Sequence, residues 1–286
     1  MPRILSFLAG SLLLCSVATA QEFPQPQASP HAVVTQTIGL TEVTVDYHAP
    51  NVKGRKVWGN LVPYGQIWRA GANENTLITF SDSVRVGGKP VPAGKYSLFV
   101  LPLADEEWQL VLNKVTTHWG AEGYDEKNDV ARFPVLPETA PMRETLNYWF
   151  SDVRPGTARL NLSWEERTIS VSIRTDVNTQ VLRAMRKAVA EKPNNPQLLA
   201  QAAEYLIQNQ LEGELALRYI NQAIELNNTY ANNWLKAKLL AQKEDYTTAV
   251  AFARRAIKLG DKDDESFKTQ LPSMRAVLTQ WQAKAY

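Results

Sequence analysis

The sequence has 286 residues, of which 44% are hydrophobic and 21% are charged. These proportions are those of a globular protein of about two domains, and they exclude disordered, collagenous and coiled-coil chains. Lysine and arginine number 31 against 29 acidic residues, so the net charge of +2 gives no indication of a nucleic-acid partner.

The chain begins with a segment typical of a secretory signal peptide. A short apolar run, residues 4–17, follows Arg3, and Ala18-Thr19-Ala20 has the small residues of a signal-peptidase site. The sequence therefore predicts removal of residues 1–20 and an exported protein, periplasmic or secreted. The alternative is a lipoprotein signal that uses Cys15, which the bulky Leu14 disfavours. No later run reaches 18 apolar residues, so no transmembrane segment is expected.

After a leader over residues 21–28, residues 29–176 show the alternation of apolar and polar positions that is typical of β-strands. The candidate strands are Val43–Tyr47, Leu77–Phe80, Tyr96–Leu101, Trp108–Val115, Leu146–Phe150, Leu160–Trp164 and Ile169–Ile173. Turns are expected at Gly87-Gly88, Pro92-Ala93-Gly94 and Glu165-Glu166. Many short strands with frequent turns predict an antiparallel β-sandwich or a flattened barrel.

Residues 177–286 change to a helical pattern of alanine, leucine, glutamine and lysine. Ala216, Tyr219, Ala223, Ile224 and Leu226 recur 33 positions later as Ala249, Phe252, Ala256, Ile257 and Leu259. This spacing resembles the second helix of a tetratricopeptide repeat, whose period is near 34 residues. A half-repeat with Ala184 and Ala188 and a closing helix over Ser273–Lys284 would complete the array. The predicted fold class is therefore α+β, a β-sandwich followed by an α-helical repeat domain.

Several unusual sequence words lie in and between the predicted strands. They are Lys53-Gly54-Arg55, Leu61-Val62-Pro63-Tyr64-Gly65, Trp68-Arg69-Ala70-Gly71-Ala72-Asn73-Glu74, Pro92-Ala93-Gly94-Lys95-Tyr96, Leu112-Asn113-Lys114, Trp119-Gly120 and Tyr124-Asp125. Together they resemble a family of exported bacterial proteins known as domain of unknown function 2911, over roughly residues 29–175. The resemblance implies export and a compact β-rich domain, and it implies no reaction.

Polar and aromatic residues of these segments are the candidate ligand-binding residues. Arginines would clamp an anionic group, polar side chains would hydrogen-bond hydroxyls, and aromatic rings would stack on a sugar or an aromatic ligand. The candidates are Arg55, Tyr64, Trp68, Arg69, Asn73, Glu74, Asn113, Lys114, Trp119 and Tyr124. We expect Arg69, Asn73 and Glu74 to approach Asn113 or Lys114, because the first segment leads into a strand and the second ends one.

The sequence offers little support for catalytic or cofactor chemistry. Asp125 and Asp129 are spaced to place two carboxylates on one side of a helical turn, as an acid/base or metal pair, but a charged surface turn is normally solvated. His31, His48 and His118 match no metal-ligand spacing. Walker loops, dinucleotide-binding glycine motifs and serine nucleophile elbows are absent from the sequence, so neither a metal nor a cofactor is expected.

Three functions remain open from the sequence. The first is an exported cell-envelope binding or interaction protein, with a small molecule or glycan as ligand and helical repeats that dock a protein or support the sandwich. The second is a hydrolase or lyase acting on an envelope glycan, with Glu74, Asp129 or Lys114 transferring protons. The third is a purely structural domain, in which Arg55, Arg69 and Glu74 are buried and paired, while Trp58 and Trp68 cover the core. No catalytic residue is assigned, and the binding protein is the preferred hypothesis.

Overall fold

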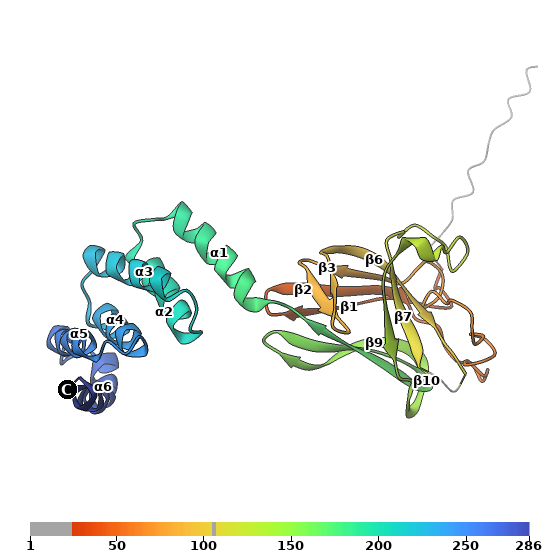
Figure 1. Cartoon of the computed structure of the whole chain (residues 1–286). Helices are drawn as coiled ribbons and strands as arrows, with labels where there is room; N and C mark the ends of the chain where they lie inside the picture. Colours follow the sequence, from red (N-terminus) through yellow and green to blue (C-terminus); the bar gives the residue numbers. More distant parts are fainter. Residues whose placement is uncertain (1–24, 105–106, 286) are drawn as a thin grey trace, which may run out of the picture. The chain divides into compact units, whose positions relative to one another are not determined.

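The structure is a computed structural model that describes residues 25–104 and 107–285 (Figure 1). The expected signal peptide and the first residues of the leader lie outside the described residues. The chain divides into two compact units, of which the first ends at Thr175 and the second begins at Asp176. Within the described ranges, no helix is long and apolar enough to cross a membrane.

The first unit contains two antiparallel sheets (Figure 1). Its strands are β1 (His31–Ile38), β2 (Thr41–His48), β3 (Leu77–Phe80), β4 (Val84–Val86), β5 (Lys89–Val91), β6 (Gly94–Leu101), β7 (Trp108–Asn113), β8 (Asp129–Val135), β9 (Glu138–Arg154) and β10 (Thr157–Arg174). A six-stranded sheet has the order β1-β2-β3-β6-β7-β8, and a four-stranded sheet has the order β5-β4-β10-β9. The fold is therefore the expected antiparallel sandwich, and its two sheets do not close into the alternative flattened barrel in the part of the chain described.

The long strand β10 folds back on itself near Glu165. The amide of Thr175, just after the strand, donates a hydrogen bond to the carbonyl of Gly156, just before it, at 2.9 Å. Between these ends, the hydroxyl of Ser170 donates to Oδ1 of Asn161 at 2.6 Å. Glu165 has a positive φ of 52°, the conformation of a tight turn. The arms of β10 before and after Glu165 therefore lie side by side, as the turn expected at this position requires.

Four tryptophans form an aromatic cluster in the sandwich, three of them buried in its core and Trp68 packed against it. The ring of Trp58 lies 4.5 Å from that of Trp108 and 6.0 Å from that of Trp164. The ring of Trp68 stacks on Trp164 at a centroid distance of 5.7 Å. Offset and edge-to-face contacts of this kind add to the free energy gained from burying large apolar rings. Trp68 therefore packs against the interior of the sandwich.

In its described residues, the second unit consists of six helices. These are α1 (Val177–Glu191), α2 (Pro196–Gln208), α3 (Gly213–Leu226), α4 (Tyr230–Gln242), α5 (Tyr246–Leu259) and α6 (Glu265–Lys284). Helices α2 and α3 pack together, and so do α4 and α5. Ala216 of α3 and its repeat counterpart Ala249 of α5 are fully buried, so the 33-residue repeat places small residues where helices approach closely. The closing helix is longer than expected, because Asp264 caps a first turn that begins before Ser273.

Candidate functional site

A loop between β7 and β8, residues 114–128, covers part of the outer face of the six-stranded sheet; we call it the covering loop. Val100 of β6 belongs to the sandwich core, so the preceding residue, Phe99, faces away from that core. Phe99 and its cross-strand neighbour Val111 are nevertheless fully buried. The ring of Tyr124, from the covering loop, lies 5.1 Å from that of Phe99. The loop therefore makes a second, smaller interior on the outside of the sandwich.

Asp129 holds the covering loop to the sheet. Its carboxylate accepts hydrogen bonds from Nδ2 of Asn113 at 2.9 Å, from the hydroxyl of Tyr124 at 2.7 Å and from Nε of Arg132 at 2.8 Å. Only 9% of the Asp129 side chain is exposed. Hydrogen bonds to a carboxylate are stronger than those between neutral groups, and partial exclusion of water strengthens them further. The loop end, β7 and β8 are therefore joined through one charged group.

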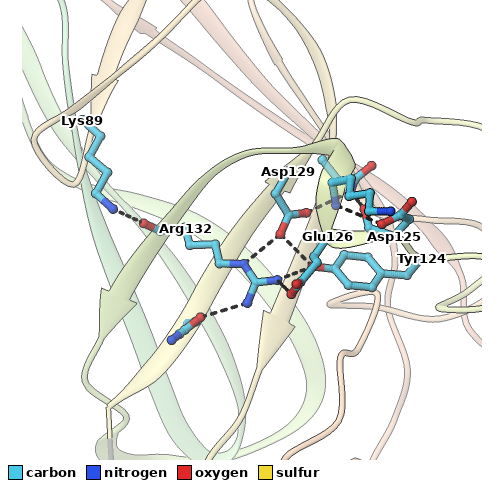
Figure 2. A network of polar contacts seen from close by, with 9 residues as sticks. Lys89, Tyr124, Asp125, Glu126, Asp129 and Arg132 are labelled. Atoms are coloured by element: carbon cyan, nitrogen blue, oxygen red, sulfur yellow. Dashed lines mark hydrogen bonds and ion pairs between the residues drawn. The ribbon is translucent and has the colours of Figure 1, made fainter.

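The guanidinium of Arg132 is engaged on almost every side (Figure 2). Besides Asp129, it donates to the hydroxyl of Tyr124 at 2.7 Å, to Oε2 of Glu126 at 3.2 Å and to Oε1 of Gln109 at 3.3 Å. An arginine has five N–H donors, and these four contacts use four of them. Arg132 therefore braces the covering loop and has little capacity left for an anion.

The same contacts keep protons on both Tyr124 and Arg132. Burial, the hydrogen bond to Asp129 and the charge of Asp129 raise the pKa of Tyr124, against an opposite effect of Arg132. Burial lowers the pKa of Arg132, but the hydrogen bond to Asp129 and the neighbouring charges of Tyr124, Asp129 and Glu126 raise it overall. A general acid or base works best with a pKa near the operating pH, so neither group is prepared for proton transfer near neutrality.

The expected helical turn with two carboxylates on one side does not form. A 3-10 helix spans only Glu126–Asn128. Oδ1 of Asp125 caps its start by accepting from the amide of Lys127 at 2.9 Å, and the helix ends at Asp129, whose backbone is extended. Asp129 instead begins β8 and serves the network around Arg132. An open hollow of about 350 Å³ borders the network, with Lys89 bound to the carbonyl of Arg132 nearby (Figure 2). The two carboxylates therefore have separate structural partners.

Arg69 also lies against the covering loop, but it makes no hydrogen bond or ion pair with the residues that the structure describes. Trp68 pairs with Val100 and packs on the core, so Arg69 points to the outer face. A Cβ atom on Gly120 would lie 3.1 Å from Nη1 of Arg69, which shows that the guanidinium packs on this buried glycine. Nε of Arg69 is buried without a hydrogen bond, and burial lowers the pKa of the group. Among the described residues, no carboxylate pairs with Arg69.

Two of the candidate aromatic rings are exposed to solvent, and one of them belongs to the covering loop. Trp119 precedes the glycine that contacts Arg69, and it is 65% exposed. Gly120 has a φ of +81°, a conformation that side chains rarely adopt, so the loop needs glycine at the point of contact. Tyr64 is 40% exposed, and its ring lies over Gly59. The covering loop thus presents an indole to solvent beside the residue that contacts the unpaired cation.

Asn73 contacts the segment that precedes β1, and Glu74 contacts the end of β2. Nδ2 of Asn73 donates to the carbonyl of Ser29 at 3.3 Å. Oε2 of Glu74 lies 3.2 Å from Nδ1 of His48. The pairing of Arg69 with Glu74 that the structural hypothesis required therefore gives way to a pairing of Glu74 with His48.

Asn75, which sequence reasoning missed, connects this segment to the covering loop. Its Nδ2 donates to Oγ of Ser97 at 3.0 Å, and Ser97 donates to the carbonyl of Val115 at 2.8 Å. The amide of Val115 donates to Oδ1 of Asn113 at 3.0 Å. Oδ1 of Asn75 is buried and accepts no hydrogen bond. A serine within the apolar run 96–101 is the sequence signal that could have indicated this contact.

Arg55 and Lys114 have exposed side chains with local roles. Arg55 donates to the carbonyls of Asn51 and Val52 at 2.7 and 2.9 Å, so it closes its own turn. The backbone amide of Lys114 donates to the carbonyl of Asn128 at 3.0 Å. In the described part of the chain, no group of three or more histidine, cysteine, aspartate or glutamate side chains is placed to hold a metal ion.

Comparison with known proteins gives one match. The sequence profile of a family described as "Protein of unknown function (DUF2911)" matches residues 29–173, which is 173 − 28 = 145 of the 286 residues. No curated protein and no solved structure matches the chain. The matched stretch contains Arg69, Arg132 and the whole covering loop, and it ends within β10. The helical unit lies outside it.

Proposed function

We propose that this chain, which belongs to the DUF2911 family, is an exported binding protein that holds a small anionic ligand at Arg69. The observation that carries the proposal is the half-buried guanidinium of Arg69, to which no described residue supplies a hydrogen bond or a counter-ion. Partial burial of an unpaired charge lowers folding stability. Groups that lower stability in this way are typical of functional sites, where a ligand supplies the missing partner.

The surroundings of Arg69 indicate the chemistry of the ligand. A guanidinium binds carboxylate or phosphate through two parallel hydrogen bonds. The exposed indole of Trp119, beside Gly120, offers a flat surface on which a sugar ring can stack. A sugar acid would satisfy both groups at once. We therefore take a monosaccharide that carries a carboxylate as the ligand to test.

The positions and partners of the acidic residues favour a binding protein over a glycan hydrolase. A hydrolase needs two carboxyl groups that converge on one cleft. Glu74 pairs with His48, whereas Asp129 is bound by Arg132, Tyr124 and Asn113. The signal-like pattern of residues 1–20 supports the export part of the proposal, in which the helical unit would dock a protein or support the sandwich.

The test is stabilisation of the full chain from residue 21 onward by ligand. Thermal unfolding is followed with glucuronate, with inorganic phosphate and with glucose, which has the same ring as glucuronate but no carboxylate. A ligand at 100 times its Kd adds about 2.7 kcal/mol to the free energy of unfolding. We expect glucuronate to raise the Tm of the wild type and of the control Arg55→Met, and to leave that of Arg69→Met unchanged. Equal stabilisation of Arg69→Met, or no effect of either anion on the wild type, would contradict the proposal.

A further inference from the structure

Arginines line up across the outer face of the four-stranded sheet, at the end opposite to Glu165. Arg85 of β4 lies directly opposite Arg174 of β10. On the other arm of β10, Thr157 lies directly opposite Arg154 of β9. The two arms are hydrogen-bonded at these ends, so Arg174 and Thr157 are neighbours. Directly opposite residues share a face, and three arginines therefore lie in one line across the sheet.

A fourth arginine adjoins this line. Arg159 follows Thr157 by two positions, and Ala158 between them is buried in the core, so Arg159 shares the outer face. We call Arg85, Arg154, Arg159 and Arg174 the arginine row. All four side chains are exposed.

The arginine row has no acidic partner among the described residues. One side chain of the row is hydrogen-bonded within its own hairpin: Nη1 of Arg85 donates to the carbonyl of Gly88 at 2.7 Å. The nearest acid along β9 is Asp152, an exposed residue whose positive φ of 51° marks an irregularity of that strand. Like charges directly opposite each other destabilise a sheet. The row therefore keeps its charges available to an external anion, at some loss of stability.

Next to the row, the same face carries polar side chains and one tryptophan. Trp149 is 38% exposed, and its Nε1 donates to Oγ of Ser163 at 3.1 Å. Nδ2 of Asn161 donates to Oγ of Ser151 at 3.1 Å, and Asn161 also accepts from Ser170. These contacts hold the indole of Trp149 among hydroxyl and amide side chains.

We propose that this face binds a linear acidic polysaccharide, whose carboxylates contact the arginine row and one of whose sugar rings contacts Trp149. Strands are about 4.8 Å apart, so the row extends about 14 Å over three strand steps, which suits a chain of regularly spaced anions better than a single ion. A membrane surface would call for a cluster of projecting apolar side chains. Beside the row, Pro90, opposite Arg85, and Val153, next to Arg154 in β9, are exposed and apolar. The other neighbours, Thr157, Ser151 and Asn161, are polar, so polar side chains predominate around the row. The site lies on the other sheet from Arg69 and does not rest on the function proposed above.

The experiment compares two triple variants of the full chain from residue 21 onward on immobilised polygalacturonate. Arg85→Gln/Arg159→Gln/Arg174→Gln removes three charges from the row. Arg55→Gln/Lys114→Gln/Arg143→Gln removes three exposed charges elsewhere, so the two proteins have the same net charge. We expect salt-sensitive binding of the wild type, a loss of at least tenfold in the row variant and a change of less than twofold in the control. Dextran, a neutral polymer, should retain none of them.

Several results would overturn the inference. An equal loss in both triple variants would show that only net charge matters. Absence of wild-type binding to polygalacturonate would exclude the polymer, and binding to phosphatidylglycerol vesicles alone would identify a membrane surface instead. Thermal melts accompany each measurement, and we expect the row variant to melt no lower than the wild type. If the triple variant does not fold, the single variants Arg85→Gln and Arg174→Gln are compared with Arg143→Gln, with a loss of threefold or more expected only in the row.

Discussion

Arg132 and Arg69 both lie between the covering loop and the outer face of the six-stranded sheet. Arg132 donates four hydrogen bonds and contacts the carboxylates of Asp129 and Glu126. Arg69 packs on Gly120 and donates no hydrogen bond to any described residue. The difference shows that the number of hydrogen bonds an arginine makes within the chain indicates its role. A guanidinium whose donors are bound within the chain stabilises the fold. A partly buried guanidinium without such partners lowers the stability unless a ligand binds it.

Among the substitutions that test this comparison, Asp129→Ala should cause the largest loss of stability. It removes three accepted hydrogen bonds and leaves Arg132, Tyr124 and Asn113 without their shared acceptor. Because the carboxylate is 9% exposed, we expect a loss of about 3 kcal/mol in the free energy of unfolding, measured by urea denaturation. The double variant Asp129→Ala/Arg132→Met should regain part of it, since removal of both partners leaves no unpaired charge. A loss below about 1 kcal/mol would mean that the network is solvated and is not a brace.

The substitution Gly120→Ala should cause the next largest loss of stability, through its contact with Arg69. The left-handed conformation at φ +81° disfavours a side chain, and the new methyl group would lie 3.1 Å from Nη1 of Arg69. We expect a loss of about 2 kcal/mol in thermal or urea unfolding. In the double variant Gly120→Ala/Arg69→Met the steric part should disappear, so the two changes should be non-additive by about 0.5 kcal/mol or more. Strict additivity would show that loop and guanidinium do not touch in solution.

Substitution of Tyr124 by phenylalanine tests how the brace depends on one hydroxyl. The change removes a donor to Asp129 and an acceptor for Arg132, with an expected loss of about 1.5 kcal/mol near neutral pH. The raised pKa of Tyr124 also gives a sign for the pH dependence: its stabilisation is complete below the unfolded pKa of about 10 and is lost as the pH rises beyond it. Between pH 8 and 11, the free energy of unfolding measured by urea denaturation should therefore decrease less steeply in the variant than in the wild type. The buried Tyr148, whose pKa is also raised, would keep part of the alkaline slope.

The alternation of apolar residues was enough to predict the sandwich, because one face of each strand had to be buried. It even indicated the reversal within β10, since the two arms Leu160–Trp164 and Ile169–Ile173 alternate on either side of Glu165. The arginine row could not be predicted in this way. Arg85 and Arg174 are far apart in sequence, and only the strand register brings them together.

Local sequence spacing was less informative about the site. Arg69 and Glu74 are five positions apart, which suggested an ion pair. Ala70 and Asn73 between them have positive φ values of 52° and 53°, and these turns direct Glu74 to His48 instead. Positive φ at residues other than glycine has a weak sequence signal, because tertiary contacts impose it. Arg69 has no partner among the described residues because of how it packs on the covering loop, which follows β7 and is distant from Arg69 in sequence.

Substitution of Arg69 by methionine should have the smallest effect on stability, and its sign is informative. Methionine keeps much of the apolar length of the side chain, so packing on Gly120 is largely retained. The variant loses no hydrogen bond or ion pair with the described residues, and it removes a charged group whose pKa is lowered by burial. We therefore expect the free energy of unfolding to stay within about 1 kcal/mol of the wild type. We expect an increase and not a decrease, because the variant removes an unpaired charge. Arg132→Met, the same chemical change under the same loop, is the matched control and should lose roughly 2 to 3 kcal/mol. If both variants lost stability equally, Arg69 would have a structural partner after all, and the contrast between the two arginines would fail.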